Sequence, residues 1–291
     1  MILVAGGTGT VGTLLVRMLA TGGARVRVLT RDAGRAAALR GTGLDAVVGD
    51  VRDPATLADA SRGCGVVISA IHGFTAGRGI SPATVDRDGN IALVGAAVDA
   101  GVEHLVLTSV YGAAATHPMS LHRMKYAAEQ AFIGSGLHWT IIRPTPFLET
   151  WIDLIGVNLA DSGKALVFGR GDNPINFVSA RDVASVIEHA VHDQSLRNRI
   201  LDVTGPENLT FNQIADRLTA AIDSPTRTSH IPLAALRTVA LLAKPVAPAF
   251  ARQAQAAVVM NTTDMTTHDE SALPQRTTLD ELLGGRDCRI S

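Results

Sequence analysis

The glycines near the start of the chain constrain its fold more than any other feature of the sequence. Gly6, Gly9 and Gly12 lie three residues apart, between the apolar segment 1–5 and the amphipathic segment 10–21. A strand, a tight glycine turn and a helix in this order let the backbone approach a pyrophosphate, which the free N–H groups of the helix N-terminus can bind. The alternative is a tight turn that binds nothing. In this setting we expect a dinucleotide site, and its loop residues would be Gly6, Thr8, Gly9, Thr10, Val11 and Gly12.

Short apolar runs alternate with amphipathic stretches along the first half of the chain, a pattern typical of repeated βαβ units. The expected strands are 1–5, 25–30, 45–48, 65–70, 104–108 and 139–143. The expected helices between them are 10–21, 33–39, 54–61, 83–100 and 121–135. Right-handed crossovers would assemble the strands in the order 3-2-1-4-5-6. The sequence therefore predicts an α/β fold with a Rossmann-type doubly wound parallel sheet.

The regular alternation ends after Pro144. The elements expected beyond it are a helix over 147–159, a strand near Val167, a strand and helix in INFVSARDVASVIEHAV, a strand near 200–204 and a helix over 211–222. The strand near 200–204 would return to the main sheet. We therefore predict an NAD(P)-binding Rossmann domain over 1–145 and a small C-terminal substrate lobe over 146–291, interleaved with the main sheet.

The end of the second strand predicts which dinucleotide binds. NAD sites place an acid there for the ribose 2′-hydroxyl, whereas NADP sites place an arginine for the 2′-phosphate. If the strand ends at Thr30, the acid position is empty and Arg31 is placed for the phosphate. Alternatively, Arg31 is solvated and Asp32 caps the next helix, or a shift of two residues makes Asp32 the ribose acceptor. We expect NADP(H) to be preferred, with NAD(H) possible.

Residues at two further strand ends would line the cofactor. Asp50 and Val51 follow the third strand, where a carboxylate can accept a hydrogen bond from the adenine amino group. Ala70 and Ile71 end the fourth strand and would line the path of the cofactor across the sheet. Plain packing at the strand ends is the alternative for both pairs.

The segment after the fourth strand would lie near the substrate. Its glycines and Pro82 indicate a mobile loop over 73–90, at the edge of the sheet where open α/β sheets bind ligands. His72 or Phe74 could face the substrate. A surface loop without function is the alternative.

Six segments carry a resemblance to a known family: GGTGTVG from Gly6, VLTRD from Val28, GDVRDP from Gly49, LVLTSVYGA from Leu105, MKYAAEQAFIGSGLHWTIIRPTPF from Met124 and the later FVSARDVA. Together they resemble the extended and atypical short-chain dehydrogenases, in particular the NmrA-like branch. The resemblance covers the first three-quarters of the chain and is most specific in the cofactor half. It implies a relative of NADPH-dependent reductases, quinone reductases and NADP-sensing regulators.

The active enzymes that the chain resembles use a tyrosine and a lysine four residues apart on the fifth helix. Residues i and i+4 are neighbours on one helical face, so the ammonium can lower the pKa of the phenol and hold the nicotinamide ribose. This sequence keeps Lys125 but has Leu121 in place of the tyrosine. It therefore lacks the helical acid of these enzymes.

The resemblance implies three candidate catalytic residues. Lys125 would contact the cofactor, although a surface ion pair with Glu129 at i+4 is the alternative. Ser109 and Tyr111 lie just beyond the fifth strand, where related enzymes place a catalytic hydroxyl. Tyr111 could replace the missing acid or could be a wall residue.

Other residues of the same region are expected to have supporting roles. Pro144 ends the sixth strand in a segment that resembles the one backing the nicotinamide in relatives, so we expect it to contact the cofactor. The segment 147–151, with Phe147, Leu148 and Trp151, would then form an apolar substrate wall. The histidine and tyrosine on either side of Lys125, His122 and Tyr126, are expected to be structural or solvated.

Composition and charge exclude several classes of protein. The formal net charge of −1 leaves no electrostatic footprint for nucleic acid. Cys64 and Cys288, the two cysteines, lie far apart and predict neither a disulfide framework nor a metal site. The apolar stretch from Ile231 is interrupted by Arg237 and Lys244 and predicts no membrane span. We expect a cytoplasmic protein with a small-molecule partner, no direct nucleic-acid partner, no membrane partner, no metal and an open oligomeric state.

Two functions fit these expectations. The first is an NADP(H)-binding reductase of a small apolar carbonyl or quinone-like substrate, in which the cofactor supplies the hydride. The second is a non-catalytic module that senses NADP(H). Leu121 favours the sensor, and the expected substrate lobe favours the enzyme. An epimerase of nucleotide sugars would also need the absent tyrosine.

Overall fold

The chain forms two compact units. The computed structural model describes residues 1–75, 79–157, 159–221, 227–267 and 276–285. Unit 1 comprises Met1–Pro144 and Ala180–Val203, and unit 2 comprises Thr145–Ser179 and Thr204–Ser291. The assignment of a cofactor domain and a substrate lobe along the chain stays a prediction.

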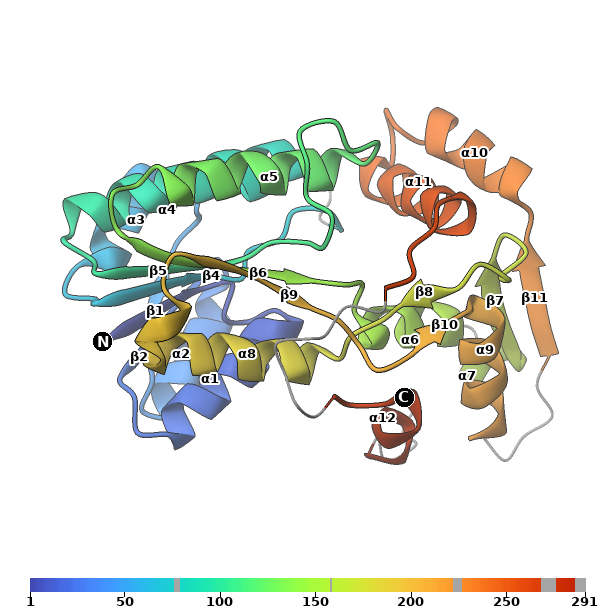
Figure 1. Ribbon diagram of the computed structural model, residues 1–291, viewed down its shortest axis with the longest axis horizontal. Helices are drawn as coiled ribbons and strands as arrows, with labels where there is room; N and C mark the ends of the chain where they lie inside the picture. The colour runs from blue at the N-terminus through green and yellow to red at the C-terminus, as the bar shows by residue number, and fades with distance from the viewer. Residues whose placement is uncertain (76–78, 158, 222–226, 268–275, 286–291) are drawn as a thin grey trace. The chain divides into compact units, whose positions relative to one another are not determined.

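Unit 1 is built on a seven-stranded parallel sheet (Figure 1). Across the sheet, its strands are β3 (Asp45–Val48), β2 (Val26–Thr30), β1 (Ile2–Ala5), β4 (Val66–Ser69), β5 (His104–Thr108), β6 (His138–Pro144) and β9 (Arg199–Val203). The expected order 3-2-1-4-5-6 is confirmed, and β9 pairs in parallel with β6. The central strands β1 and β5 are buried along their whole length, which explains why they are continuous apolar runs.

Helices cover both faces of this sheet. Figure 1 shows α3 (Pro54–Ser61), α4 (Asp88–Asp99) and α5 (Ser120–Ile133) on one face, and α1 (Thr10–Thr21), α2 (Ala33–Gly41) and α8 (Ala180–His192) on the other. A short 3-10 helix, η2 (Gln194–Leu196), leads into β9. Leu93 and Phe132 are completely buried against Leu105 of the sheet, so the apolar stripes of α4 and α5 face this core. The doubly wound fold expected from the sequence is therefore confirmed.

Part of the segment after β4 differs from the mobile loop expected over 73–90, of which residues 76–78 lie outside the described residues. Residues 82–87 form a π-helix, η1 (Pro82–Arg87), which is followed directly by α4. Ser81 caps it: the Ser81 hydroxyl accepts a hydrogen bond from the Thr84 amide at 3.2 Å, and the Thr84 hydroxyl accepts one from the Ser81 amide at 3.0 Å. The expectation was wrong for this part because Pro82 occupies the first turn of a helix, where its missing N–H costs nothing.

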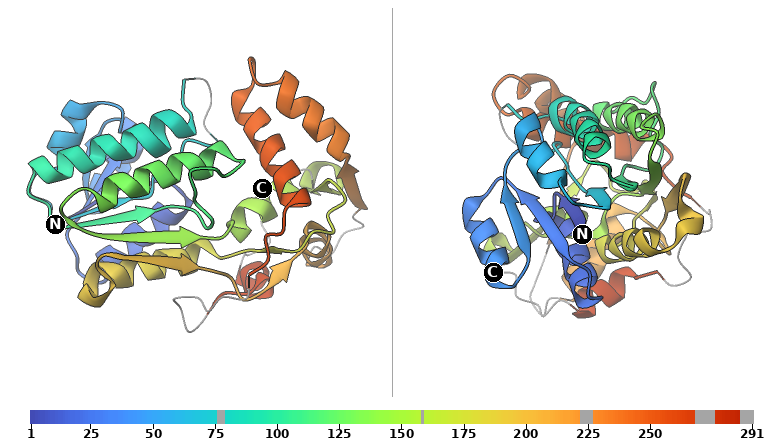
Figure 2. Two further views of the ribbon diagram at one scale, coloured as in Figure 1. Left: turned by 45° about the horizontal axis from the view of Figure 1, so that its top comes forward. Right: turned by 90° about the vertical axis from the view of Figure 1, so that its left-hand side faces the viewer.

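Unit 2 contains two short sheets and several helices. Strands β7 (Lys164–Phe168) and β11 (Arg227–Ile231) pair in parallel, and β8 (Ile175–Asn176) pairs antiparallel with β10 (Asn208–Leu209). The helices are α6 (Leu148–Gly156), α7 (Leu159–Ser162), α9 (Phe211–Ala220), α10 (Leu233–Leu242), α11 (Pro248–Thr262) and α12 (Leu279–Gly285). Helices α10 and α11 run side by side (Figures 1 and 2).

Aromatic rings fill the core of unit 2. The rings of Trp151 and Phe211 lie 4.7 Å apart, and Phe168 and Phe177 complete the cluster. Trp151 and Leu148 are only 8% and 2% exposed in this core. The expectation that these two side chains form a substrate wall was therefore wrong, because both pack inside their own unit.

No helix among the described residues is both long and apolar enough to cross a bilayer.

Candidate functional site

The candidate site lies at the edge of the unit 1 sheet where the strands end, which we call the carboxyl edge. Because all seven strands are parallel, the residues that follow them emerge at this one edge. The expected cofactor residues that follow β1, β2, β3 and β4 are thus brought together here: the loop 6–12, Arg31, Asp50, Val51, Ala70 and Ile71. Ser109, Tyr111 and Pro144 follow or end β5 and β6 at the same edge.

Two glycines of the loop, Gly6 and Gly12, are required by the protein's own backbone. Gly6 has a positive φ of 86°, and a Cβ there would lie 2.5 Å from the carbonyl oxygen of Ala70. A Cβ on Gly12 would lie 2.1 Å from the carbonyl oxygen of Gly6. On Gly9, by contrast, the nearest atom to a Cβ would be 3.4 Å away, an ordinary contact. The fold alone does not explain a glycine at position 9, whereas a ligand lying against the exposed face of the loop does.

The N-terminus of α1 presents its amides at this loop. Gly9 is the N-cap, no side chain caps the helix, and its first turn holds no acidic residue. By contrast, Asp32 and Asp53 cap α2 and α3 with their carboxylates. The first amides of α1 thus keep the partial positive charge of a helix N-terminus for an anion. Thr8 and Thr10 are part-buried and exposed hydroxyls on either side of Gly9.

Three arginines gather after β2 and β3. Arg31 is exposed. Hydrogen bonds from Arg52, and to a lesser extent the charges of Arg52 and Arg31, hold the pKa of Asp50 below its usual value against the opposing effect of burial. Arg52 binds Asp50 through two nitrogens, at 2.9 and 2.7 Å. Arg35 extends to the carbonyl oxygen of Thr8 in the glycine loop, at 3.4 Å. The sequence analysis missed Arg35 and Arg52, although each lies within four residues of a predicted site residue.

The end of β2 decides between the alternatives for Asp32. The strand ends at Thr30, as the NADP interpretation requires. The Asp32 carboxylate accepts a hydrogen bond from the Arg35 amide at 3.0 Å and caps α2. The helix-cap alternative is therefore confirmed for Asp32, and the shift of two residues is not observed.

Lys125 is buried, at only 2% exposure, and is held by the ends of two strands. Its ammonium donates to the carbonyl oxygens of Ile71, at 3.0 Å, and Thr108, at 2.9 Å. It also forms an ion pair with Asp86 at 3.1 Å. The alternative of a surface ion pair between Lys125 and Glu129 was wrong, because the Glu129 carboxylate binds Arg143 instead. We refer to the two buried charges as the Lys125–Asp86 pair.

Asp86 lies on η1 and is the central residue that the sequence analysis missed. Its side chain is completely buried. One carboxylate oxygen accepts the Gly73 amide at 2.9 Å, and the other lies 3.1 Å from Lys125 and 3.6 Å from Nδ1 of His72. Burial opposes its ionisation, but Lys125, His72 and the Gly73 amide together hold the pKa of Asp86 below its ordinary value of 3.8. Asn90 supports the turn, since its amide donates to the Asp86 carbonyl at 2.8 Å.

The hydroxyl of Ser109 has a partner within the fold. It donates to the buried carboxylate of Glu129 at 2.5 Å. Arg143 binds the same carboxylate through two nitrogens, at 2.8 and 2.6 Å. The amide of Tyr111 donates to the carbonyl of Pro144 at 2.8 Å, so the loop after β5 is fixed to the end of β6. Tyr111 itself is half-buried.

The first turn of α5 carries an apolar residue at the position where related enzymes carry an acid. Leu121, in the place of the tyrosine, is 7% exposed. His122 is buried and stacks on His117 with ring centroids 3.8 Å apart. Burial, together with the neighbouring His117, lowers the pKa of His122 to about 3. His122 is therefore neutral at physiological pH.

Comparison with known families agrees with this geometry. A model of the NAD(P)H-binding family matches residues 6–194, which include the glycine loop, the arginines and the Lys125–Asp86 pair. The chain belongs to the NAD(P)H-binding family. The NAD(P)-binding family expected from the sequence is therefore confirmed.

Relatives and a solved structure extend the family assignment. The NAD(P)H azoreductase of Xenophilus azovorans is 32% identical, over 78% of this chain and 76% of its own length. The (4-alkanoyl-5-oxo-2,5-dihydrofuran-3-yl)methyl phosphate reductase of Streptomyces griseus is 34% identical, over 88% of this chain and 86% of its own length. The triphenylmethane reductase of Citrobacter sp., solved with NADP(H), shares the fold with a TM-score of 0.80 and 18% identity, over 97% of this chain and 98% of that chain.

The donors present fit an NAD(P)H cofactor of this family. The open side of Gly9 and the uncapped α1 offer amides to a pyrophosphate. Arg31 and Arg35 are exposed cations after β2, where a 2′-phosphate would be bound. Among the described residues, no cluster of three or more His, Cys, Asp or Glu side chains could hold a metal ion.

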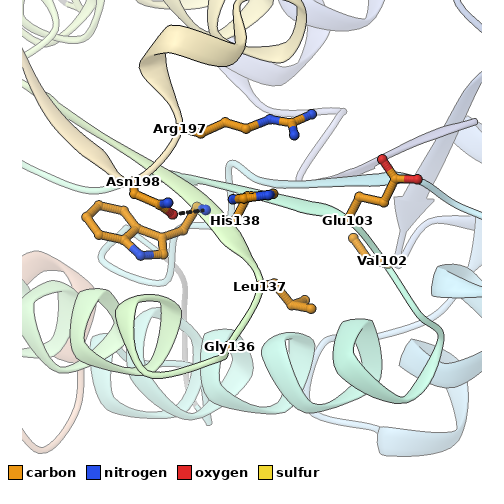
Figure 3. Close-up of a pocket in the computed structure, with 8 residues that line it drawn as sticks. Val102, Glu103, Gly136, Leu137, His138, Arg197 and Asn198 are labelled. Atoms are coloured by element: carbon orange, nitrogen blue, oxygen red, sulfur yellow. Dashed lines mark hydrogen bonds between the residues drawn. The ribbon is translucent and has the colours of Figure 1, made fainter.

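A depression of about 640 Å³ lies at the opposite edge of the same sheet (Figure 3). Its lining comes from residues that precede or begin β5, β6 and β9: Val102, Glu103, Gly136, Leu137, His138, Trp139, Arg197 and Asn198. Asn198 accepts a hydrogen bond from the Trp139 amide at 3.2 Å and thereby closes the turn before β9. Because ligands of parallel sheets bind at the carboxyl ends of the strands, we assign this depression no part in cofactor binding.

Proposed function

We propose that the chain is an NADPH-dependent reductase of a small apolar carbonyl or quinone-like acceptor. The observation that carries the proposal is the Lys125–Asp86 pair, buried beneath the ends of β4 and β5. Burying two charges costs desolvation free energy, and such pairs are concentrated at functional sites. Two relatives above 30% identity, an azoreductase and a reductase of a (dihydrofuranyl)methyl phosphate, are both reductases by name.

The preference for NADPH rests on the arginines. Arg31 follows β2 directly, and Arg35 lies one helical turn further on, beside the glycine loop. Arginine binds a phosphate through two parallel hydrogen bonds, and the nearby Asp32 uses its Oδ1 to cap α2. We therefore assign the 2′-phosphate to Arg31 and Arg35.

The other site residues expected from the sequence then have these roles in the proposal. When bound, the reduced nicotinamide supplies a hydride to the acceptor. Gly6, Thr8, Gly9, Thr10, Val11 and Gly12 would form the pyrophosphate loop, and Asp50, Val51, Ala70, Ile71 and Pro144 would line the cofactor. Lys125 would fix the ends of β4 and β5, and it would contact the nicotinamide ribose by exchanging one of its carbonyl partners. Tyr111 would border the acceptor, and Ser109 would position Glu129.

The second candidate function is NADP(H) sensing without chemistry. The observation in its favour is Leu121, which leaves α5 without the tyrosine of active short-chain enzymes. A sensor would bind NADPH at the same edge and transfer no hydride.

An assay of NADPH oxidation separates the two functions. Purified protein is mixed with NADPH and a panel of quinones and apolar aldehydes and ketones, and the loss of nicotinamide absorbance is followed. Gly9→Val, which should not bind the cofactor, is the control for background oxidation. The reductase predicts acceptor-dependent oxidation that Gly9→Val lacks. Tight NADPH binding with no oxidation above that control across the panel would favour the sensor.

A further inference from the structure

His72 is the titratable side chain that the proposed function leaves without a role. It follows Ile71, the residue whose carbonyl Lys125 binds, and so lies two residues beyond Ala70 on the path assigned to the cofactor. Its side chain is 44% exposed, in contrast to the buried charges beside it. Its ring lies 5.9 Å from that of Phe74. The histidine is therefore accessible at the carboxyl edge.

The buried Asp86 carboxylate faces one nitrogen of this histidine. Nδ1 of His72 lies 3.6 Å from Oδ1 of Asp86, the oxygen that Lys125 also approaches. This oxygen is buried and accepts no hydrogen bond of good geometry among the described residues. A completely buried acceptor without a hydrogen bond is costly, and His72 is the exposed donor within reach of it. Hydrogen bonds at catalytic sites are often long before the substrate binds.

The fold holds Asp86 in place independently of His72. The π-helix η1 carries it, Gly73 donates to its second oxygen, and Asn90 binds its backbone carbonyl. A Cβ on Gly73 would lie 2.6 Å from the carbonyl oxygen of Ser81, so the chain from His72 to η1 is closely packed. A π-helical turn inside a helical segment often marks a functional site. The carboxylate is thus preorganised toward the imidazole.

We propose that His72, oriented by the Lys125–Asp86 pair, is the proton donor that replaces the absent helical tyrosine. The proposal rests on the proposed reductase function and names the acid for that reaction. Asp86 is a positioning residue: it accepts a hydrogen bond from Nδ1 and leaves Nε2 of the exposed ring to face the acceptor.

The reaction balances with one hydride and one proton. The carbonyl carbon gains the hydride, and the carbon–oxygen π bond breaks toward the oxygen. That oxygen takes the proton from Nε2 of the protonated ring, so the Nε2–H bond breaks and an O–H bond forms. The imidazole keeps the electron pair at Nε2, retains its proton at Nδ1 opposite Asp86, and regains a proton from solvent.

A pair of acceptors separates proton donation from every other role of His72. A carbonyl or quinone needs both a hydride and a proton, whereas the central carbon of a cationic triphenylmethane dye needs the hydride alone. His72→Phe keeps an aromatic ring beside Phe74 but has no nitrogen. We expect this variant to lose about a hundredfold or more in turnover of the carbonyl and to keep turnover of the dye and affinity for NADPH. The matched control is His189→Phe, an exposed histidine on α8.

The tautomer of His72 gives a second readout that needs no cofactor. In alkaline buffer, nitrogen-15 NMR of the neutral ring should find the proton on Nδ1, facing Asp86. A proton on Nε2 instead would overturn the orientation that we propose.

The activity results distinguish two failures. Equal losses on carbonyl and dye, or no loss on either, in an active protein would overturn the role of His72 and leave the reductase standing. A wild type that reduces neither acceptor would remove the proposed function, and the proton donor with it.

Discussion

At the scale of single residues, the glycine loop separates what the fold requires from what a ligand requires. Gly6 and Gly12 are enclosed by backbone, so any side chain there would displace the loop itself. Gly9 is exposed and could carry a Cβ in ordinary contact with the loop, so its lack of a side chain is best explained by a cofactor. Adding a side chain at Gly6 or Gly12 should therefore destabilise the fold, whereas adding one at Gly9 should weaken cofactor binding.

Gly9→Val should abolish measurable binding of NADPH, because the side chain occupies the approach of the pyrophosphate. Its thermal unfolding midpoint should stay close to that of the wild type. Gly12→Ala is the matched comparison and should lower the midpoint, because its Cβ would lie 2.1 Å from the Gly6 oxygen. Cofactor titration and thermal unfolding of both variants provide the measurement. Unchanged affinity in Gly9→Val would mean that the loop is only a turn.

Arg31→Ala and Arg35→Ala should each weaken NADPH binding far more than NADH binding. A hydrogen bond to a charged group contributes about 1.5–3 kcal/mol, so each loss should be roughly tenfold or more. Arg62→Ala, an exposed arginine at the end of α3, is the control and should alter neither affinity. Calorimetric titration of both cofactors measures the discrimination. A wild type that binds NADH as tightly as NADPH would contradict the assignment of the 2′-phosphate.

At the scale of elements, α5 and η1 are held together by the Lys125–Asp86 pair and pack against one another. Lys125 and Asp86 are 39 positions apart in the sequence, so their ion pair joins two elements that local sequence does not connect. Lys125→Met should therefore destabilise the protein by about 3–5 kcal/mol, because it leaves a buried carboxylate unpaired. Lys125→Met/Asp86→Asn should recover much of that loss. Urea unfolding of the single and double variants tests the coupling, and strictly additive losses would contradict it.

The same pair gives a dependence of stability on acid pH. Since the pKa of Asp86 is lower in the folded protein than its ordinary 3.8, its contribution is present above that value and is lost as the pH falls through the folded-state pKa. Wild type should therefore lose stability below about pH 4, and Asp86→Asn should lose less over the same range. Urea unfolding along a pH series measures this, and parallel curves would contradict the assignment.

His122 on α5 predicts a second loss of stability, at less acid pH than that of Asp86. Its pKa is lowered from 6.5 to about 3, so the neutral ring stabilises the fold above pH 6.5 and this contribution is lost as the pH falls toward 3. By linkage the loss at pH 5 is about 2 kcal/mol relative to neutral pH. His122→Phe should remove most of this dependence, whereas His189→Phe, at an exposed position, should not. Equal pH dependence in wild type and His122→Phe would contradict the buried neutral ring.

The sequence predicted the parts of these elements that follow local rules. The strand–turn–helix pattern and the glycine spacing predict the loop 6–12. The parallel order of the strands then brings Arg31 and Lys125 to one edge of the sheet. Asp86 could not be found in this way, because η1 begins in a segment with the composition of a loop and its partner is remote in sequence. Glu129 shows the converse: helical spacing suggested Lys125 as its partner, but tertiary structure pairs it with Arg143.

At the scale of the whole molecule, the polarity of the parallel sheet divides unit 1 by function. The carboxyl edge gathers the glycine loop, the arginines and the Lys125–Asp86 pair, whereas the depression at the amino edge is lined by turn residues. The residues matched by the NAD(P)H-binding family include those gathered at the carboxyl edge. What distinguishes a reductase from a sensor is whether a hydride leaves the bound cofactor for an acceptor.

The most direct test of the account is therefore a transfer experiment. NADPH that carries deuterium at the reactive carbon of its nicotinamide is incubated with the protein and a carbonyl or quinone acceptor, and the product is examined by mass spectrometry. The account predicts one deuterium in the reduced product, formed by wild type and not by Gly9→Val. Bound NADPH that transfers deuterium to no acceptor of the panel would contradict it.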